Sequence, residues 1–168
     1  MKFQFYYEKL IDSEDYQKFV KENPLAFHSS GFFVLDLENN GKDNSVHFDM
    51  FLEKPKPKMF SFKVTGNVEL LPVENFDPRI PEKLSMNYTF DLMNIKEKIE
   101  KKMQDEQIKG KLKKLLFSLQ KLNKIDYLVI NGFLDNMGML KVTYDLSKKE
   151  ITQIEKKSFL DMFKIIKK

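Results

Sequence analysis

Two aspartates and two histidines are the residues of this sequence whose types could support acid–base or metal chemistry. Asp49 and Asp145 lie in the short patterns VHFDM and VTYDL, where each follows a valine and an aromatic residue at the same spacing. An aspartate at the end of a strand usually accepts backbone hydrogen bonds from the next turn, and we expect that role for both. His28 and His47 have no metal-binding spacing, so we expect structural or surface roles for them.

Motifs for nucleophilic catalysis and for phosphate binding are missing from the chain. Its serines lack the G-x-S-x-G elbow, its 6 glycines form neither a G-x-G-x-x-G pattern nor a P-loop, and it contains no cysteine. Without cysteine there is no disulfide, no thiolate metal site and no cysteine nucleophile. We therefore predict a protein that is not an enzyme and that uses no cofactor or metal.

The composition is typical of a globular protein of one domain or two small ones. Of the 168 residues, 42% are hydrophobic and 32% are charged, which allows a buried core at this length. Charged residues interrupt the N-terminal region before any apolar run reaches the length of a signal peptide, and no window approaches the roughly 20 apolar residues that cross a bilayer. We therefore expect a cytoplasmic location and no membrane insertion.

Basic residues are concentrated in the second half of the chain. Residues 1–93 contain 11 basic and 15 acidic side chains, whereas 94–168 contain 18 basic and 10 acidic ones. Eight of the lysines form a candidate basic surface on a stretch that we predict to be helical, 94–124: Lys96, Lys98, Lys101, Lys102, Lys109, Lys111, Lys113 and Lys114. Since no aromatic residues interleave with them to stack on bases, a solvated helix face is favoured over a nucleic-acid surface.

The first half of the chain carries strand patterns and one short helix. Ser13 is an N-cap signal for the helix, and Asn23 with Pro24 ends it. Strands are predicted at 2–10, 31–37, 46–52 and 59–64. Lysines and prolines just before the last of these strands favour a position at the margin of the sheet.

The second half begins with a helical pattern. Asn94 and Glu97 form a capping-box pattern, and apolar residues recur at helical spacing as far as Leu122. These features predict one long helix with a kink or a break at Gly110.

Strand patterns follow the predicted helix. They cover 127–133 and 139–146. Two interpretations fit the C-terminal region: a strand at 151–156 followed by a short helix at 159–166, which we favour, or one continuous helix over 148–167.

The two halves show the same predicted order of a helix followed by three strands. With an offset of 96 residues, four positions match in type: Val46 with Val142, Phe48 with Tyr144, Asp49 with Asp145, and Met50 with Leu146. We predict an α+β fold of two similar helix-plus-antiparallel-sheet halves. The first half is 1–72, the connector is 73–93, and the second half, with a short C-terminal helix, is 94–168.

This arrangement resembles a tandem of PepSY-like or cystatin-like units, each a helix packed on a small antiparallel sheet. The resemblance covers 13–66 and 94–156, and its most specific part is the run DLSKKE at 145–150. PepSY-like units often have a turn of the form Asp-x-x-Thr-Gly-Glu at this place, whereas Lys148 and Lys149 replace the Thr-Gly pair here. The tryptophan common in the family is also absent. The resemblance implies a module that binds or inhibits peptidases.

We expect a non-enzymatic binding or interaction module whose partner is a protein. Recognition is expected at a sheet edge or in a groove between helix and sheet, and the candidate interaction strand is Phe32, Phe33, Val34 and Leu35. A carrier of an apolar small ligand or lipid is one alternative, because 16 phenylalanines and 9 methionines could line a cavity of about 300 Å³ or more. Nucleic-acid binding is the least favoured alternative, and the oligomeric state stays open.

Overall fold

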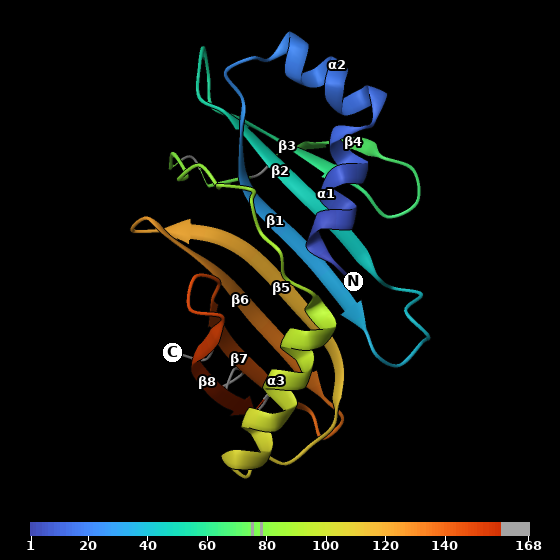
Figure 1. The fold of residues 1–168 in the computed structure, drawn as a ribbon, viewed down its shortest axis with the longest axis vertical. Helices are drawn as coiled ribbons and strands as arrows, with labels where there is room; N and C mark the ends of the chain where they lie inside the picture. Colours follow the sequence, from blue (N-terminus) through green and yellow to red (C-terminus); the bar gives the residue numbers. More distant parts are fainter. Residues whose placement is uncertain (75, 78, 159–168) are drawn as a thin grey trace.

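In the part of the chain that the structure describes, an eight-stranded antiparallel sheet forms the body of the molecule, with three helices on it (Figure 1). The structure is a computed structural model and describes residues 1–74, 76–77 and 79–158. The strand order is β4-β3-β2-β1-β5-β6-β7-β8. The predicted α+β class is therefore confirmed.

The first part of the chain forms two helices and four strands. These elements are α1 (Phe3–Ile11), α2 (Glu14–Glu22), β1 (Phe27–Asp36), β2 (Ser45–Leu52), β3 (Lys58–Lys63) and β4 (Glu69–Val73). The Ser13 hydroxyl accepts a hydrogen bond from the Tyr16 N–H, which confirms the predicted N-cap of α2. The strand predicted at 2–10 is wrong: this segment is α1, and its buried Phe3 and Leu10 are two helical turns apart on one face.

The position predicted for β3 is also wrong. β4 pairs with β3 from Met59↔Val73 to Lys63↔Glu69, so β3 lies inside the sheet and β4 forms the margin. β4 contains Pro72, a residue suited to an edge strand because it offers no N–H to a further neighbour.

The second part of the chain forms one helix and four strands. These elements are α3 (Leu92–Asp105), β5 (Leu112–Leu122), β6 (Ile125–Leu134), β7 (Gly138–Asp145) and β8 (Glu150–Ser158). The long helix predicted over 94–124 is wrong, since α3 ends at Asp105 and the remainder contains β5. Asp91, and not Asn94, caps α3, because its carboxylate accepts the Met93 N–H at 2.9 Å. Gly110, at a φ of 121°, lies in the break between the two elements.

β8 decides between the two interpretations of the C-terminal region in favour of a strand. It is a strand over 150–158 that pairs with β7, which excludes a helix beginning at 148. The short helix predicted at 159–166 lies outside the described residues.

β1 and β5 join the two parts of the sheet. Their antiparallel register runs from Gly31↔Leu119 to Asp36↔Lys114. In β5, Leu115, Phe117 and Leu119 alternate with more exposed residues and are completely buried in the core. This alternation has the period of a strand buried on one face.

The match at an offset of 96 residues is not between equivalent strands. Val46 to Met50 lie in β2, the neighbour of β1, whereas Val142 to Asp145 lie in β7, which is separated from β5 by β6. A valine followed two residues later by an aromatic residue fits any strand with one buried face, so the similarity of the patterns follows from their shared period.

The core is richest in aromatic rings in the first part of the chain. The Phe48 ring lies 5.7 Å from the Phe3 ring, 6.0 Å from the Tyr7 ring and 5.8 Å from the Phe33 ring, measured between centroids. In the second part, buried side chains such as Ile99 and Leu128 are mainly aliphatic. Within the described residues, none of the three helices has the length and apolar character to span a membrane.

Candidate binding cleft

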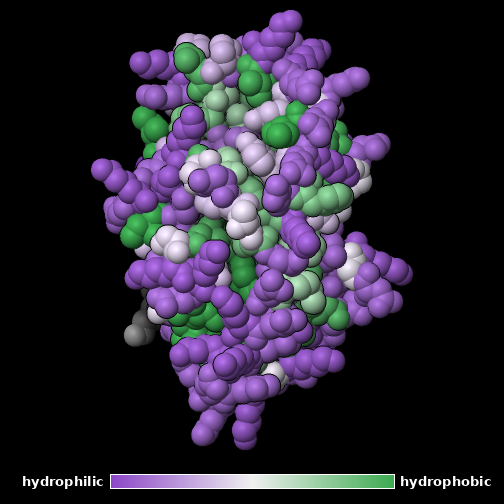
Figure 2. All heavy atoms as spheres, in the orientation of Figure 1, coloured by the Kyte–Doolittle hydropathy of each residue, from purple (hydrophilic) through white to green (hydrophobic). Residues whose placement is uncertain are grey.

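A cleft of about 530 Å³ lies beside the N-terminal part of α3. Four segments line it: the connector at 85–91, residues 94–98 of α3, the β5–β6 turn at 124–126, and the β7–β8 region at 144–149. The cleft is half open to solvent. On the face shown in Figure 2, hydrophobic groups lie in small clusters between hydrophilic ones.

Apolar and aromatic side chains form much of the wall of the cleft. They come from all four segments: Tyr88, Phe90, Ile95, Ile125 and Leu146. Burial raises the pKa of Tyr88 to about 12, so its hydroxyl keeps its proton near neutral pH. The cleft thus offers apolar contact area together with a hydroxyl group that stays neutral.

Lys98 is the best-positioned cation of the cleft. Its Nζ donates to the Lys149 carbonyl oxygen at 2.7 Å and to the Tyr144 hydroxyl at 3.3 Å, and it lies 5.4 Å from the centroid of the Tyr144 ring. All of these partners are uncharged. Tyr144 is only 4% exposed, so the ammonium group of the exposed Lys98 lies against a buried ring.

The two carboxylates of the lining are already compensated. Asp91 lies 3.3 Å from the N-terminal ammonium of Met1. The Oδ1 of Asp126 lies 3.5 Å from the Lys121 ammonium, and its Oδ2 accepts a hydrogen bond from the Ser85 hydroxyl at 3.1 Å. These carboxylates are therefore not counterions of Lys98.

The other two lysines of the lining are Lys124 and Lys149. Within the described residues, neither side chain has a carboxylate within ion-pair distance. Glu82 accepts the backbone N–H of Lys124 at 2.9 Å, which places one negative charge near that residue. The lining of the cleft keeps an excess of positive charge.

The predicted basic surface does not lie on one helix face. Its eight lysines are divided between α3, the following loop and β5, and four of them form ion pairs: Lys96–Glu100, Lys102–Glu106, Lys113–Glu38 and Lys114–Asp43. Lys101, Lys109 and Lys111 lie elsewhere on α3 and the loop, and of the eight only Lys98 lines the cleft. Much of the charge predicted for this surface is therefore neutralised locally.

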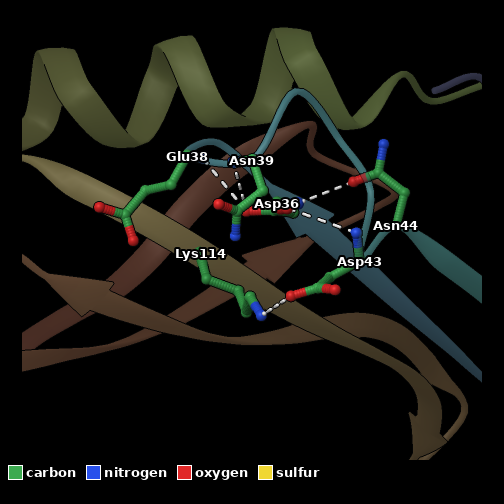
Figure 3. Close-up of polar contacts among 6 residues, drawn as sticks. All are labelled: Asp36, Glu38, Asn39, Asp43, Asn44 and Lys114. Atoms are coloured by element: carbon green, nitrogen blue, oxygen red, sulfur yellow. Dashed lines mark hydrogen bonds and ion pairs between the residues drawn. The ribbon is translucent and has the colours of Figure 1, made fainter.

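The β1–β2 loop shows how this neutralisation is built (Figure 3). The Asp36 carboxylate accepts the backbone N–H groups of Glu38, Asn39 and Asp43 at 3.1 to 3.3 Å, and Asp43 then binds the Lys114 ammonium at 2.9 Å. Burial of Asp36 would raise the pKa of its carboxyl, but the three backbone donors outweigh it and hold the pKa below the ordinary value of 3.8. The acidic loop is thus a structural turn that also pairs with β5.

The predicted interaction strand cannot accept a further strand. Phe32 pairs with His47 of β2 on one side and with Ser118 of β5 on the other, so both edges of β1 are occupied. Phe33 and Leu35 are buried in the core. Phe32 is 38% exposed, and its side chain lies on the sheet face opposite to that of Phe33, as does that of Val34. The prediction that these residues bind a partner by adding a strand to β1 is therefore wrong.

The two aspartates singled out in the sequence have different roles. Asp145 accepts the backbone N–H groups of Ser147 at 2.9 Å and Lys148 at 3.0 Å, so its expected role in a turn is confirmed. Asp49 lies within β2 and accepts the Ser30 hydroxyl at 2.7 Å, which differs from the expected turn. The two residues lie on different strands, β2 and β7, and the structure does not bring them together as a pair.

His28 is buried, as expected for a structural histidine. Its Nε2 lies 2.9 Å from the Tyr16 hydroxyl, and its ring stacks on the Tyr16 ring. Burial, assisted by the nearby positive charge of Lys83, lowers the pKa of His28 to about 4. His47 pairs with Phe32 across β1 and β2. The described residues contain no group of three or more His, Asp or Glu side chains that could hold a metal ion.

Comparison with known proteins gives a relationship in fold. No family model and no curated protein matches the sequence. A crystal structure of a candidate lipoprotein from Clostridium difficile 630 matches with a TM-score of 0.50 and 14% identity, over 86% of this chain and 91% of that one. At this identity the likeness concerns the fold alone.

Sequence reasoning did not find the cleft. Its lining combines the connector and the start of α3 with the segments at 124–126 and 144–149, which are distant from them in the chain. The motifs in these segments, the Asn94–Glu97 pattern and the run at 145–150, indicate a helix start and a turn and not a site. The run NYTFD at 87–91 is the local feature that could have indicated a binding surface, because it places two aromatic residues in a connector that otherwise contains prolines.

Proposed function

We propose that this chain is a non-enzymatic binding module that holds a segment of a partner protein in the cleft beside α3. The observation that carries the proposal is the cleft itself, whose volume of about 530 Å³ lies within the range of small-molecule and peptide sites. Its wall combines aromatic rings with hydrogen-bond donors. A half-open cleft suits a chain segment that enters from solvent and leaves again.

The test compares a blocked cleft with a matched surface change. Asn94 and Lys101 are both exposed on α3, but only Asn94 lines the cleft. Asn94→Trp would place a large ring in the cleft, whereas Lys101→Trp adds the same ring elsewhere on the helix. The immobilised wild type and both variants are incubated with a lysate of the source organism, and the retained proteins are compared.

The expected result is a protein that the wild type and Lys101→Trp retain and Asn94→Trp loses. Hydrogen exchange of the complex should then show protection in the cleft segments at 85–91 and 94–98. Equal retention by all three proteins, or no specific retention by the wild type, would overturn the proposal.

The resemblance to PepSY-like units belongs to this proposal. In support, four antiparallel strands follow the helices α1 and α2 in the first part and the helix α3 in the second, and the first strands of the two parts, β1 and β5, pair at the centre of the sheet. We infer a duplication of two similar halves, with β2, β3 and β4 corresponding to β6, β7 and β8. The resemblance makes a peptidase of the cytoplasm the first partner to examine.

A carrier of an apolar small ligand is the second candidate. It is favoured by one observation, the volume of the cleft, which exceeds the roughly 300 Å³ that a small-molecule site needs. Native mass spectrometry of gently purified protein tests it. A mass adduct that Asn94→Trp lacks would support a carrier, whereas a bare protein in both samples would favour the protein-binding function.

A further inference from the structure

The cleft contains a pair of hydrogen-bond donors, Lys98 and the buried Tyr144, that have no carboxylate partner among the described residues. The Lys98 ammonium has three N–H groups, of which the Lys149 carbonyl and the Tyr144 hydroxyl accept two. The Tyr144 hydroxyl acts as an acceptor in its bond to Lys98, and within the described residues no acceptor for its own proton is found. One N–H of Lys98 and the O–H of Tyr144 therefore remain, with their heavy atoms 3.3 Å apart.

Two donors at this separation match the geometry of one carboxylate. Its oxygen atoms can accept both hydrogen bonds at the same time, and bonds to a charged donor are roughly twice as strong as neutral ones. The side chains of Lys124 and Lys149 add positive charge around this point. The aspartates of the lining do not compete, because Asp91 and Asp126 have their own cationic partners.

The wall next to these donors is apolar. Ile95 precedes Lys98 by about one helical turn, and Leu146 follows Tyr144 by two residues; both line the cleft. Tyr88 and Phe90 contribute aromatic rings from the connector. A ligand that fills the cleft must therefore carry its negative charge next to apolar groups.

We propose that the cleft recognises an acidic segment of a partner chain, in which a carboxylate side chain flanked by apolar side chains binds Lys98 and Tyr144. This inference rests on the proposed function, since it names the chemistry of the partner in the same cleft. The carboxylate takes the remaining N–H of Lys98 and the O–H of Tyr144. The apolar neighbours of the carboxylate lie against Ile95 and the rings of the connector.

The experiment uses two peptides that differ in one charge. Acetyl-Phe-Glu-Leu-amide and acetyl-Phe-Gln-Leu-amide are titrated into the ¹⁵N-labelled full chain, and the dissociation constants are fitted from shifts of the backbone amides that line the cleft. We expect the acidic peptide to bind about tenfold more tightly than its neutral analogue, because one charge-assisted hydrogen bond contributes roughly that factor. Added salt should weaken only the acidic peptide.

Three variants assign the effect to residues. Lys98→Met should weaken binding of the acidic peptide about tenfold, whereas Lys101→Met, on the same helix but outside the cleft, should leave it unchanged. Because Lys98 also supports the β7–β8 turn, Lys149→Asn provides a second variant. It removes a cleft charge and retains the backbone carbonyl that Lys98 binds, and Asn tolerates the φ of 56° at this position. It should weaken binding about two- to threefold, since it removes charge without a direct contact.

The outcomes separate this inference from the proposed function. Equal binding of both peptides at the cleft would overturn the assignment of a carboxylate and leave the cleft as a binding site. An effect of Lys98→Met no larger than that of Lys101→Met would do the same. 4-Phenylbutanoate serves as a free acid: affinity equal to that of the acidic peptide would overturn the assignment to a chain segment. If no probe shifts the cleft amides, the inference fails, and the capture experiment with Asn94→Trp decides separately on the proposed function.

Discussion

The two parts of the molecule fill their cores with different side chains. Ring–ring contacts are concentrated between residues 3 and 90, where the Phe48 ring alone meets those of Phe3, Tyr7 and Phe33. In the second part the buried side chains are mainly Leu, Ile and Val. The aromatic part buries a histidine, whereas the aliphatic part leaves a cleft beside α3 whose lysines form no ion pair with a carboxylate among the described residues. The aromatic core and the cleft thus lie in different parts of the sheet.

Truncation of the central ring should give the largest loss of stability. Phe48→Ala removes a fully buried ring with several ring partners, and we expect the free energy of unfolding to fall by about 3–5 kcal/mol. Leu128→Ala, at a fully buried site of the aliphatic part, should lower it by about 3 kcal/mol. Urea unfolding of both variants measures the difference. A larger loss for Leu128→Ala would show that the aromatic part is not the more tightly packed one.

The buried histidine should make stability depend on pH. The pKa of His28 is about 4 in the folded protein and 6.5 in the unfolded chain. The unfolded state therefore binds more protons between these values, and stability falls as the pH is lowered from 6.5 to 4, by about 3 kcal/mol in total. The pKa values of Asp36 and Asp145 are lowered from the ordinary value of 3.8. The stability that these two carboxylates contribute is therefore lost mainly below pH 4, outside the window of His28.

Two measurements check the contribution of His28. NMR titration of the imidazole protons should give a pKa near 4 for His28, and His28→Gln should reduce the pH dependence of urea unfolding between pH 4 and 6.5. The part that remains comes from His47, because burial lowers its pKa as well. A pKa close to 6.5 for His28 would contradict the closed packing of the aromatic part.

The helix caps offer the smallest and most closely matched comparison. Ser13 caps α2 in the first part, and Asp91 caps α3 in the second. Each substitution by alanine should lower the free energy of unfolding by about 1 kcal/mol, because one backbone N–H at the helix start loses its acceptor. Asp91→Ala should cost more than Ser13→Ala, since it also breaks the ion pair with the N-terminal ammonium. Urea unfolding at neutral pH tests this order, and the reverse order would contradict it.

Local patterns predicted most strands but misassigned two segments. The segments that form β1, β2, β3, β6 and β7 carry strand patterns next to turn signals, so their assignment needed no tertiary information. For β8 the local pattern left a strand and a helix open, and the pairing with β7 decides between them. In 112–122, the leucines at 112, 115, 116, 119 and 122 match helical spacing, and Phe117 was the residue that this interpretation left out. Phe117 lies opposite Phe33 of β1. That contact between distant segments fixes the strand, and it is not contained in the local sequence.

The same reason explains why the candidate site was not predicted. Lys98 was found among the lysines of 94–124, but its importance comes from Tyr144 and Lys149, which lie about fifty residues later. The composition indicated a basic segment correctly. It could not indicate which lysines have carboxylate partners, because Lys113 and Lys114 find theirs in the loop after β1.

The central pairing of β1 with β5 sets a constraint on the order of assembly during synthesis. β1 ends at Asp36, whereas its partner ends at Leu122, so more than eighty residues leave the ribosome between the two strands. Throughout that interval the edge of β1 that later meets β5 has no partner, and its backbone N–H and C=O groups remain open to pairing with strands of other chains. The strand at the centre of the finished sheet is therefore the exposed edge of the nascent one.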